Sequence, residues 1–327
     1  IATKRQFPVA GGDLVVSKID ARHGAYALIP PELDGGIVSA DFPVFRARDN
    51  RLAAELLAFY LRYGPLEEHF ASFAQGTTNR QRVGIDDIKA TVVPVPDEED
   101  QDAILARLDQ QQRILFQAAE LLADVAAFTW LDEAIFDDND VVAETFGPLV
   151  EDATDTVEPA AEPDTLWQLY SMSNVDGVTL GEKKLGSEFS PGRRYKRVVE
   201  DAIVYAIDRV NVGTVGIMPP ADDRSIISPY RAVFRCLPGL DPRFVFYVMK
   251  APFFRRRIRD SQVGAVRNEL QFSKFVEVPF RVPRMERQLE VVSQIGAQLD
   301  AYRRVETIAG QAETTMRTIV GGLFSAV

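Results

Sequence analysis

The sequence predicts an α+β chain in which two pseudo-repeated, β-rich units are each followed by a long helix. Three observations predict this fold: a duplication between the two halves, short apolar runs separated by Gly and Pro in each copy, and a heptad pattern at the end of each copy. The 327 residues are enough for about two domains.

The duplication is clearest where residues 24–46 are set against residues 213–235. Nine of these 23 positions are identical without a gap. Weaker matches continue on both sides with slips of one or two residues. Each copy then runs through an apolar stretch and a proline to the pattern Glu-x-Gln, at 99–101 and 286–288. The repeat therefore predicts the same fold for both copies.

The elements of each copy follow in the same order. β-Rich runs bounded by Gly and Pro predict strands at 14–19, 25–29 and 42–45, and at 202–207, 214–218 and 232–236. Amphipathic patterns predict the helices that follow, at 52–63 with 65–73 and at 243–249 with 252–259. A short element at 84–93 completes the first copy.

A long helix is predicted at the end of each copy, over 97–136 and 284–324. Apolar residues recur there at alternating three- and four-residue steps, which is the pattern of a coiled-coil seam. Two such seams in one chain favour pairing of the two helices as an antiparallel coiled coil. The alternative is that each helix packs only on its own unit.

These patterns divide the chain into five segments: a first unit at 1–96, a helix at 97–136, an acidic linker at 137–165, a second unit at 166–283 and a second helix at 284–327. Three prolines and a Glu-Pro-Ala-Ala-Glu-Pro run indicate that most of the linker is solvated. The second unit has 27 residues before Arg193 and the first has three before Lys4, so we expect the first unit to be N-terminally incomplete.

The net charge of −11 would argue against nucleic-acid binding if the charge were spread evenly over the chain, which it is not. Residues 97–165 contain 20 acidic and 2 basic residues, whereas the rest of the chain carries a net charge of +7. Residues 193–287 alone carry 19 basic and 10 acidic residues. The acidity therefore belongs to one helix and the linker, and the second unit is basic.

Basic residues also cluster in comparable places of the two copies. The groups are 4–5, 77–82, 193–197 and 255–259, together with 267–268 after a glycine. Guanidinium groups suit phosphates and guanine edges, and Asn or Gln suits adenine edges. The alternative for 255–259 is a solvated helix face.

The ordered set of motifs resembles the specificity subunit of type I restriction-modification enzymes. It comprises 12–17 with 200–205, 76–88 with 264–275, and 96–104 with 283–291, and it covers nearly the whole chain. The resemblance implies two target recognition domains that each read half of a bipartite double-stranded DNA sequence. It further implies that the helices set the spacing and bind methyltransferase subunits, with a restriction or translocase subunit as a further candidate partner in phage defence.

In that family the recognition subunit is non-catalytic, and S-adenosylmethionine is expected in the partner methyltransferase rather than in this chain. The resemblance places the segments after Gly76 and Gly264 near DNA, with the basic groups near each unit's start as further candidates. The candidate DNA contacts are Lys4, Arg5, Lys18, Arg22, Thr78, Asn79, Arg80, Arg82, Arg193, Arg194, Lys196, Arg197, Arg209, Arg267 and Asn268.

Catalytic and metal motifs are weak. The single Cys236 excludes a disulfide framework, and two histidines leave little for an all-histidine metal site. Neither Pro-Pro pair fits the adenine-methyltransferase motif, and a Pro163-Asp164…Glu182-Lys183-Lys184 match to a magnesium nuclease pattern is short enough to be accidental. We therefore predict no catalytic residue, metal or cofactor in this chain.

Two other functions compete with the recognition subunit. One is the C-terminal recognition region of a longer, fused adenine-N6 methyltransferase; the other is an interaction scaffold whose acidic helix binds a basic partner. Because no apolar run approaches the 18 or more residues of a membrane span, we expect a cytoplasmic protein without a membrane partner.

Overall fold

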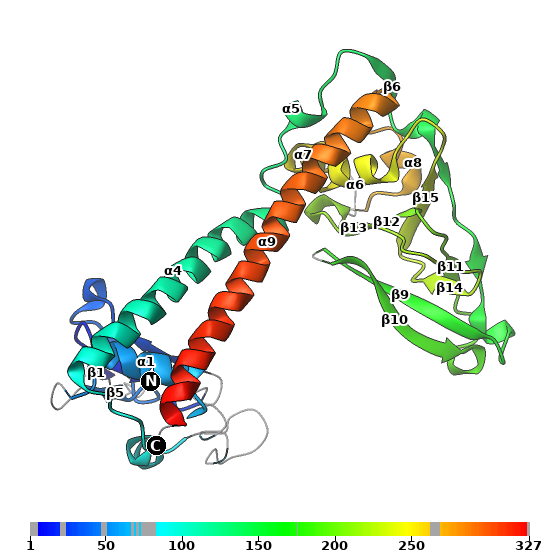
Figure 1. Cartoon of the computed structure of the whole chain (residues 1–327). Coiled ribbons are helices and arrows are strands. Elements are labelled where there is room, and N and C mark those ends of the chain that lie inside the picture. The colour runs from blue at the N-terminus through cyan, green and yellow to red at the C-terminus, as the bar shows by residue number, and fades with distance from the viewer. Residues whose placement is uncertain are drawn as a thin grey trace. The chain divides into compact units, whose positions relative to one another are not determined.

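The computed structural model describes residues 6–19, 24–46, 51–66, 69, 72, 83–174, 176–261 and 269–325. The chain forms two compact units (Figure 1). Unit 1 comprises residues 1–120 and 304–327, and unit 2 comprises residues 121–303. Each unit therefore contains part of both long helices, α4 (Glu98–Ala127) and α9 (Met285–Phe324).

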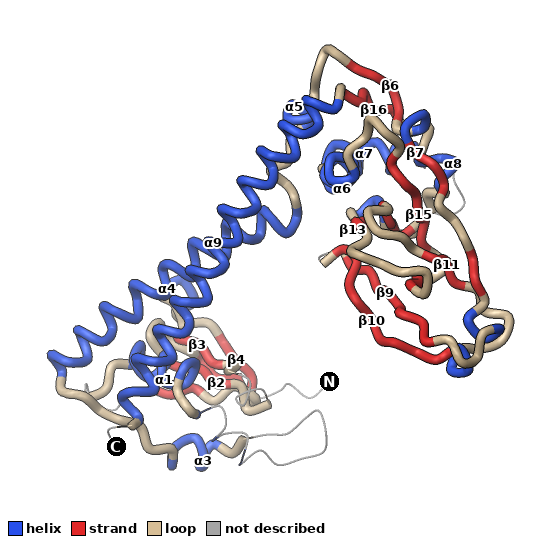
Figure 2. The backbone as a smooth tube through the Cα atoms, turned by 45° about the vertical axis from the view of Figure 1, so that its right-hand side comes forward, coloured by secondary structure: helices blue, strands red, loops and turns tan. Residues whose placement is uncertain are grey.

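Unit 1 has a three-stranded and a two-stranded antiparallel sheet. Its helix α1 (Ala54–Tyr63) lies against β3 (Figure 2). The buried side chains of β2 and α1 share one apolar cluster with Leu108 of α4 and with Met316 and Val320 of α9. The other elements are β1 (Gln6–Pro8), β2 (Leu14–Val16), β3 (Tyr26–Leu28), η2 (Pro31–Leu33), β4 (Ile37–Ser39), β5 (Val44–Phe45) and α3 (Ile85–Ala90).

Unit 2 contains sheets of the order β13-β12-β15-β7, β10-β9-β14-β11-β8 and β16-β6. Its main core is aromatic, with Phe146, Phe234 and Phe275 among its fully buried side chains. The strands are β6 (Val141–Thr145), β7 (Val150–Asp152), β8 (Thr156–Val157), β9 (Leu166–Ser173), β10 (Gly177–Leu185), β11 (Tyr195–Arg197), β12 (Ile203–Ala206), β13 (Val215–Ile217), β14 (Ser225–Ile227), β15 (Arg231–Cys236) and β16 (Pro279–Pro283).

The helices of unit 2 each contribute buried side chains to its aromatic core. They are α5 (Glu133–Phe136), α6 (Pro242–Lys250), α7 (Pro252–Ser261) and α8 (Phe272–Phe275), with short 3₁₀ turns η3 (Gly147–Leu149), η4 (Pro159–Ala161), η5 (Gly186–Glu188) and η6 (Val210–Val212). Asp241 begins α6, because its carboxylate accepts hydrogen bonds from the Arg243 and Phe244 amides.

Strand pairing in the two units follows one numbering offset. Leu14 of β2 pairs with Leu28 and Phe45, and Ile203 of β12 pairs with Ile217 and Phe234. Adding 189 to each residue number of the unit 1 pairs gives the unit 2 pairs. The pairing of β1 with β4 shifts in the same way onto that of β11 with β14.

Turns and loop hydrogen bonds repeat with the same offset. The Ser17 amide donates to the Ala25 carbonyl, as the Ala206 amide does to Thr214. The intervening turns contain Gly24 at φ 76° and Gly213 at φ 85°, a backbone conformation that favours glycine. A shift of one residue would move every side chain to the other face of a sheet, so the constant offset keeps equivalent residues on equivalent faces.

The first long helix is shorter than predicted, whereas the second is continuous (Figure 1). Residues 97–136 divide into α4, which ends at Ala127, and α5, which begins after Asp132. Phe128 adopts φ 52°, which ends the helix, and Leu131 and Phe136 are then buried in the core of unit 2. Burial of these apolar side chains outweighs continuation of the heptad pattern.

The predicted solvated linker is wrong for most of 137–165. Strands β6, β7 and β8 form there and pair with β16, β15 and β11. Phe146 is fully buried and stacks on Phe275 and Phe280. Widely spaced apolar residues anchor this acidic segment in the sheets, while Glu144 and Glu151 remain exposed to solvent.

Candidate nucleic-acid interface

The interface of unit 2 is built around the end of β12. The Leu270 amide donates a 2.9 Å hydrogen bond to the Ile207 carbonyl, directly after that strand. Leu270 is buried and lies just downstream of the predicted reading residues Arg267 and Asn268. Arg209 is exposed in the adjoining β12–β13 loop. The segment predicted to read DNA therefore rejoins the fold beside an exposed arginine.

Unit 1 has the same arrangement after β2. The Val83 amide donates a 3.0 Å hydrogen bond to the Lys18 carbonyl, and Val83 is buried. Arg82, another predicted DNA contact, directly precedes Val83. The Lys18 ammonium lies at this strand end and donates to the Ala40 carbonyl at 2.8 Å. Both units therefore have a basic residue at, or two positions after, the strand-end carbonyl that the residue following the predicted reading segment bonds.

Nine predicted contacts lie outside the described residues, so their positions stay predictions. They are Lys4, Arg5, Arg22, Thr78, Asn79, Arg80, Arg82, Arg267 and Asn268.

The basic group at 193–197 separates into exposed and internally bonded side chains. Arg193 is exposed, with its guanidinium 5.3 Å from the centre of the Tyr195 ring. Arg194 donates to Thr156 Oγ1 at 2.6 Å and to the Thr156 carbonyl at 3.0 Å. These two bonds fasten β11 to β8, so Arg194 has a structural role that its sequence neighbourhood did not indicate.

Lys196 and Arg197 are also engaged within unit 2. Lys196 donates to Thr154 Oγ1 at 3.3 Å, and burial lowers its pKa. Arg197 pairs with Asp155 at 3.3 Å, donates to the Asp223 carbonyl and stands over the Trp167 ring. Of this group, Arg193 is the side chain with the most freedom to meet a phosphate.

The arginines of α7 mainly form hydrogen bonds and ion pairs with the β12–β13 loop and with the segment that runs from the end of α4 to α5. Arg255 donates to the Val212 carbonyl at 3.5 Å and to the Ala127 carbonyl, at the end of α4, at 3.1 Å. Arg259 donates to the Asn211 carbonyl at 3.4 Å, and Arg257 pairs with Glu133. This run is therefore largely structural, with Arg256 fully on the exposed face.

Lys250 is a buried cation that the sequence did not single out. Its ammonium donates to the Asn174 carbonyl at 2.8 Å and lies 5.4 Å and 5.7 Å from the ring centres of Phe128 and Phe246. Burial, reinforced by nearby Arg255, lowers the pKa of Lys250 to about 8. A lysine at the end of an amphipathic helix gives no sequence signal of such burial.

Two residues of the Glu-x-Gln motifs also have roles that sequence reasoning missed. Gln101 and Gln288 are buried in the first turns of α4 and α9. Each amide group bonds the backbone just before an earlier helix of its own unit. Gln101 bonds Ala53 and Arg51 before α1, and Gln288 bonds Asp241 and Gly239 before α6. Their recurrence in the repeat was the available signal.

No nucleophile or metal centre emerges from the part of the chain that the structure describes. Burial raises the pKa of the Cys236 thiol to about 12, so it stays protonated near neutral pH. Lys184 pairs with Glu182 at 2.6 Å, and the described residues contain no metal-type cluster of three or more His, Cys, Asp or Glu side chains. In those same residues no helix is long and apolar enough to cross a bilayer.

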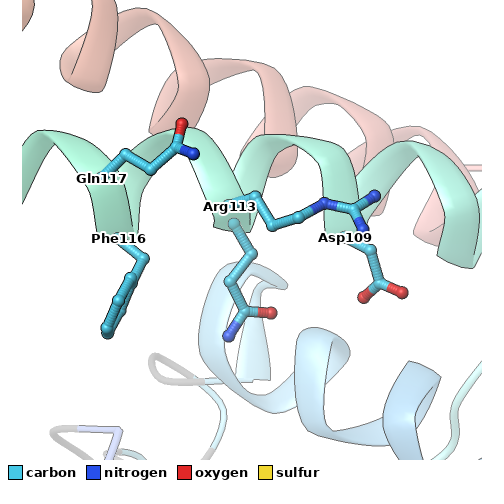
Figure 3. Close-up of a pocket in the computed structure, with 5 residues that line it drawn as sticks. Asp109, Arg113, Phe116 and Gln117 are labelled. Carbon is cyan, nitrogen blue, oxygen red and sulfur yellow. The ribbon is translucent and has the colours of Figure 1, made fainter.

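A second surface lies on α4 within unit 1. Asp109, Arg113, Phe116 and Gln117 line a shallow hollow (Figure 3), together with Gln112. Phe116 is 66% exposed, although it occupies a helix otherwise rich in acidic residues. An aromatic ring framed by charged and amide groups is typical of the centre of a protein–protein contact.

Comparison with known proteins gives fold relatives. No protein-family model and no curated protein sequence matches the chain. A chain of the type I restriction-modification system, from a study of that system's complex assembly and conformational transition, is similar with a TM-score of 0.62. The two are 18% identical, over 99% of this chain and 84% of that one.

Two further solved structures are less similar. The HsdS subunit from Thermoanaerobacter tengcongensis is 19% identical over 96% of this chain and 80% of its own, with a TM-score of 0.44. The type I restriction-modification S subunit from M. genitalium is 15% identical over 96% and 84%, with a TM-score of 0.48. The chain thus shares the α+β fold of a component of type I restriction-modification systems.

Proposed function

We propose that this chain is the DNA-sequence-specificity subunit of a type I-like restriction-modification system. The observation that carries the proposal is the duplicated strand end: Val83 bonds Lys18 in unit 1, and Leu270 bonds Ile207 beside Arg209 in unit 2. A reader of bipartite DNA needs the same apparatus twice on one chain, because each half-site requires its own groove contacts. The shared type I fold supports this function over a fused adenine-N6 methyltransferase.

The two halves of the chain would then be the two target recognition domains. We assign them to 1–96 and 166–283, with the strands of 137–165 now added to the second. The helices at 97–136 and 284–327 would pair as an antiparallel coiled coil that fixes the half-site separation. Leu108, Met316 and Val320, which share one buried cluster, support that pairing within unit 1.

Exposed and half-buried basic residues would make the DNA contacts. Lys18, Arg193 and Arg209 are the described candidates, and the nine undescribed positions complete the set. The other three, Arg194, Lys196 and Arg197, already bond groups within unit 2. They would contact DNA only through N–H groups that these bonds do not use. Phosphate contacts would set the register of each unit, and side chains such as Arg80, Arg267 and Asn268 would read base edges.

Methyl transfer would take place in a partner subunit that binds S-adenosylmethionine, in the cytoplasm. The hollow around Phe116 and the acidic residues of α4 form the surface that we assign to this methyltransferase partner. A restriction or translocase subunit would join through the assembled complex. This chain itself would bind and orient DNA without taking part in bond making.

Methylome sequencing of the source strain, with and without this gene, tests the proposal. A bipartite methylated motif that disappears on deletion and returns on complementation is the expected result. An unchanged methylome would contradict the recognition function. Purified chain incubated with S-adenosylmethionine and DNA containing the motif should transfer no methyl groups, because transfer by the chain alone would instead indicate a fused methyltransferase.

DNA affinity separates the proposed function from an interaction scaffold. The recognition subunit should bind a duplex containing the motif at low salt, with a log–log salt slope of about −0.9 per phosphate contact. A scaffold with an acidic partner surface should bind no duplex even at low salt.

A further inference from the structure

Each unit exposes one aromatic side chain at an equivalent turn. In unit 2, Tyr230 lies between β14 and β15 and is 74% exposed. In unit 1, Phe42 lies between β4 and β5 and is 42% exposed. The two turns have the same hydrogen bond, from Phe42 to Ser39 and from Arg231 to Ser228, at the 189-residue offset. The aromatic residue occupies neighbouring rather than identical positions in the two turns.

Both turns adjoin the strand end where the predicted reading segment rejoins the unit. In unit 1 the Lys18 amide donates to the Asp41 carbonyl at 2.9 Å, while the Lys18 carbonyl accepts from Val83. In unit 2 Ala206 pairs with Arg231, so Tyr230 follows at the level of Ile207, whose carbonyl accepts from Leu270. The rings therefore lie next to the interface described above.

One cationic side chain in each unit donates a hydrogen bond to the backbone of the turn that carries the ring. Arg231 donates to the Tyr230 carbonyl at 3.0 Å and approaches Asp208 at 4.0 Å. The Lys18 ammonium bonds the Ala40 carbonyl beside Phe42. An aromatic ring on a rigid turn loses little conformational entropy when it binds, since it has two side-chain torsions.

We propose that Phe42 and Tyr230 are DNA-contact residues, one in each unit, whose rings pack against a nucleobase or deoxyribose at each half-site. This inference rests on the proposed function and adds an apolar contact to the arginine and lysine set. Aromatic packing on a deoxyribose or on the methyl edge of a thymine is apolar, so it depends little on salt, unlike phosphate contacts. The rings would hold each half-site in place while the adjoining segments read base edges.

The two kinds of contact predict different effects of substitution. Tyr230→Ala should weaken binding of a motif duplex roughly tenfold to 100-fold, because burial of the ring is lost, with the salt slope unchanged. Tyr230→Phe should bind nearly as the wild type, because the ring remains. Phe42→Ala should weaken binding similarly, whereas Arg209→Ala should reduce the magnitude of the salt slope by about 0.9.

The experiment uses the full chain and a fluorescent duplex bearing the motif found by methylome sequencing, with anisotropy measured across a salt series. Ile308→Ala removes an apolar side chain that is 49% exposed on α9, and it serves as the control, which should leave DNA affinity unchanged. Duplexes with one half-site scrambled assign each ring: the effect of Tyr230→Ala should vanish when unit 2's half-site is scrambled, and that of Phe42→Ala when unit 1's is.

Three outcomes would overturn the inference. Wild-type affinity of both alanine variants would show that the rings do not touch DNA, while the proposed function would survive. Intact DNA affinity with lost methyltransferase binding would assign the rings to a protein partner. Absence of wild-type binding to any duplex would overturn the proposed function together with the inference.

Discussion

The side-chain oxygen of Gln288, at the start of α9, accepts a 2.8 Å hydrogen bond from the backbone amide of Asp241, the residue that caps α6. The Gln288 amide nitrogen donates in turn to the Gly239 and Pro283 carbonyls. Gln101 forms the corresponding set in unit 1 with Ala53, Arg51 and Pro96. One glutamine in each unit therefore fastens the long helix to the start of the helix that follows the sheet.

Gln288→Ala should lower the free energy of unfolding of unit 2 by about 2–4 kcal/mol, because it leaves three backbone groups, two of them buried, without their partner. Chemical denaturation followed by circular dichroism measures the change. Gln294→Ala, at an exposed position of the same helix, is the matched control and should change stability little. Equal stability of the two variants would contradict the structural role of Gln288.

Arg255→Met should loosen the last turn of α4. The arginine donates to the Ala127 carbonyl at the negative end of that helix, where a cation is favourable. Hydrogen exchange of the amides in 124–129 should accelerate by about tenfold, which corresponds to about 1.4 kcal/mol. Arg256→Met makes the same charge change on the exposed face of α7, and exchange in 124–129 should then stay as in the wild type.

Lys250 should make stability depend on pH in the alkaline range. The folded chain releases this proton near pH 8, whereas the unfolded chain keeps it to about pH 10.5. The unfolded state therefore binds more protons between these values, and the contribution of Lys250 to the free energy of unfolding rises with pH across that window. Thermal melts from pH 7 to 9.5 should show this rise in the wild type relative to Lys250→Met. Parallel pH profiles would contradict it.

Arg193 and Arg194 should respond differently although they are neighbours. Arg193→Ala removes an exposed cation, so DNA binding should weaken and the salt slope should fall by about 0.9. Arg194→Ala removes the bonds to Thr156, so thermal stability should fall first. Anisotropy titrations and melts on both variants check this; interchanged phenotypes would reverse the assignment.

Phe116→Asp should weaken binding of the methyltransferase partner without weakening DNA binding. The substitution places a charge at the centre of the hollow on α4. Reversing Asp109 to Lys tests the electrostatic part of the same surface. Co-purification with the partner and duplex binding, measured side by side, are the readouts, and a selective loss of DNA binding would contradict the assignment.

Much of the sheet structure could be predicted because local signals agreed with the tertiary fold. Val-rich runs and glycines placed β2 and β12 within a few residues of their observed bounds. The strands of 137–165 escaped prediction because acidic composition masked the few apolar residues, such as Phe146 and Val157, that decide burial. The end of α4 at Ala127 was hidden for a similar reason, since packing onto unit 2 overrides the heptad pattern.

The sequence predicted the location of the candidate interface better than it predicted which side chains are free to contact DNA. Composition identified Arg194 and Arg197 as basic, but their acceptors Thr156 and Asp223 come from distant segments that only the folded sheet brings close. Tyr230 and Phe42 carried no sequence signal, because exposure of a single ring depends on the turn beneath it. Gln101 and Gln288 were visible as a repeated motif, and their hydrogen bonds became visible only in the structure.

The two-stranded pair β1–β4 bears on how the protein behaves in concentrated solution. Ile37 of β4 is 61% exposed, whereas its offset partner Ile226 is fully buried in β14, which pairs with β9 in the same sheet. Within the described part of unit 1, β4 has β1 on one side and no strand on the other. An open edge flanked by apolar side chains is a template for strand-to-strand aggregation. The colloidal stability of this acidic chain would therefore depend on that edge, and a charged residue in place of Ile37 would be a rational way to improve its solubility.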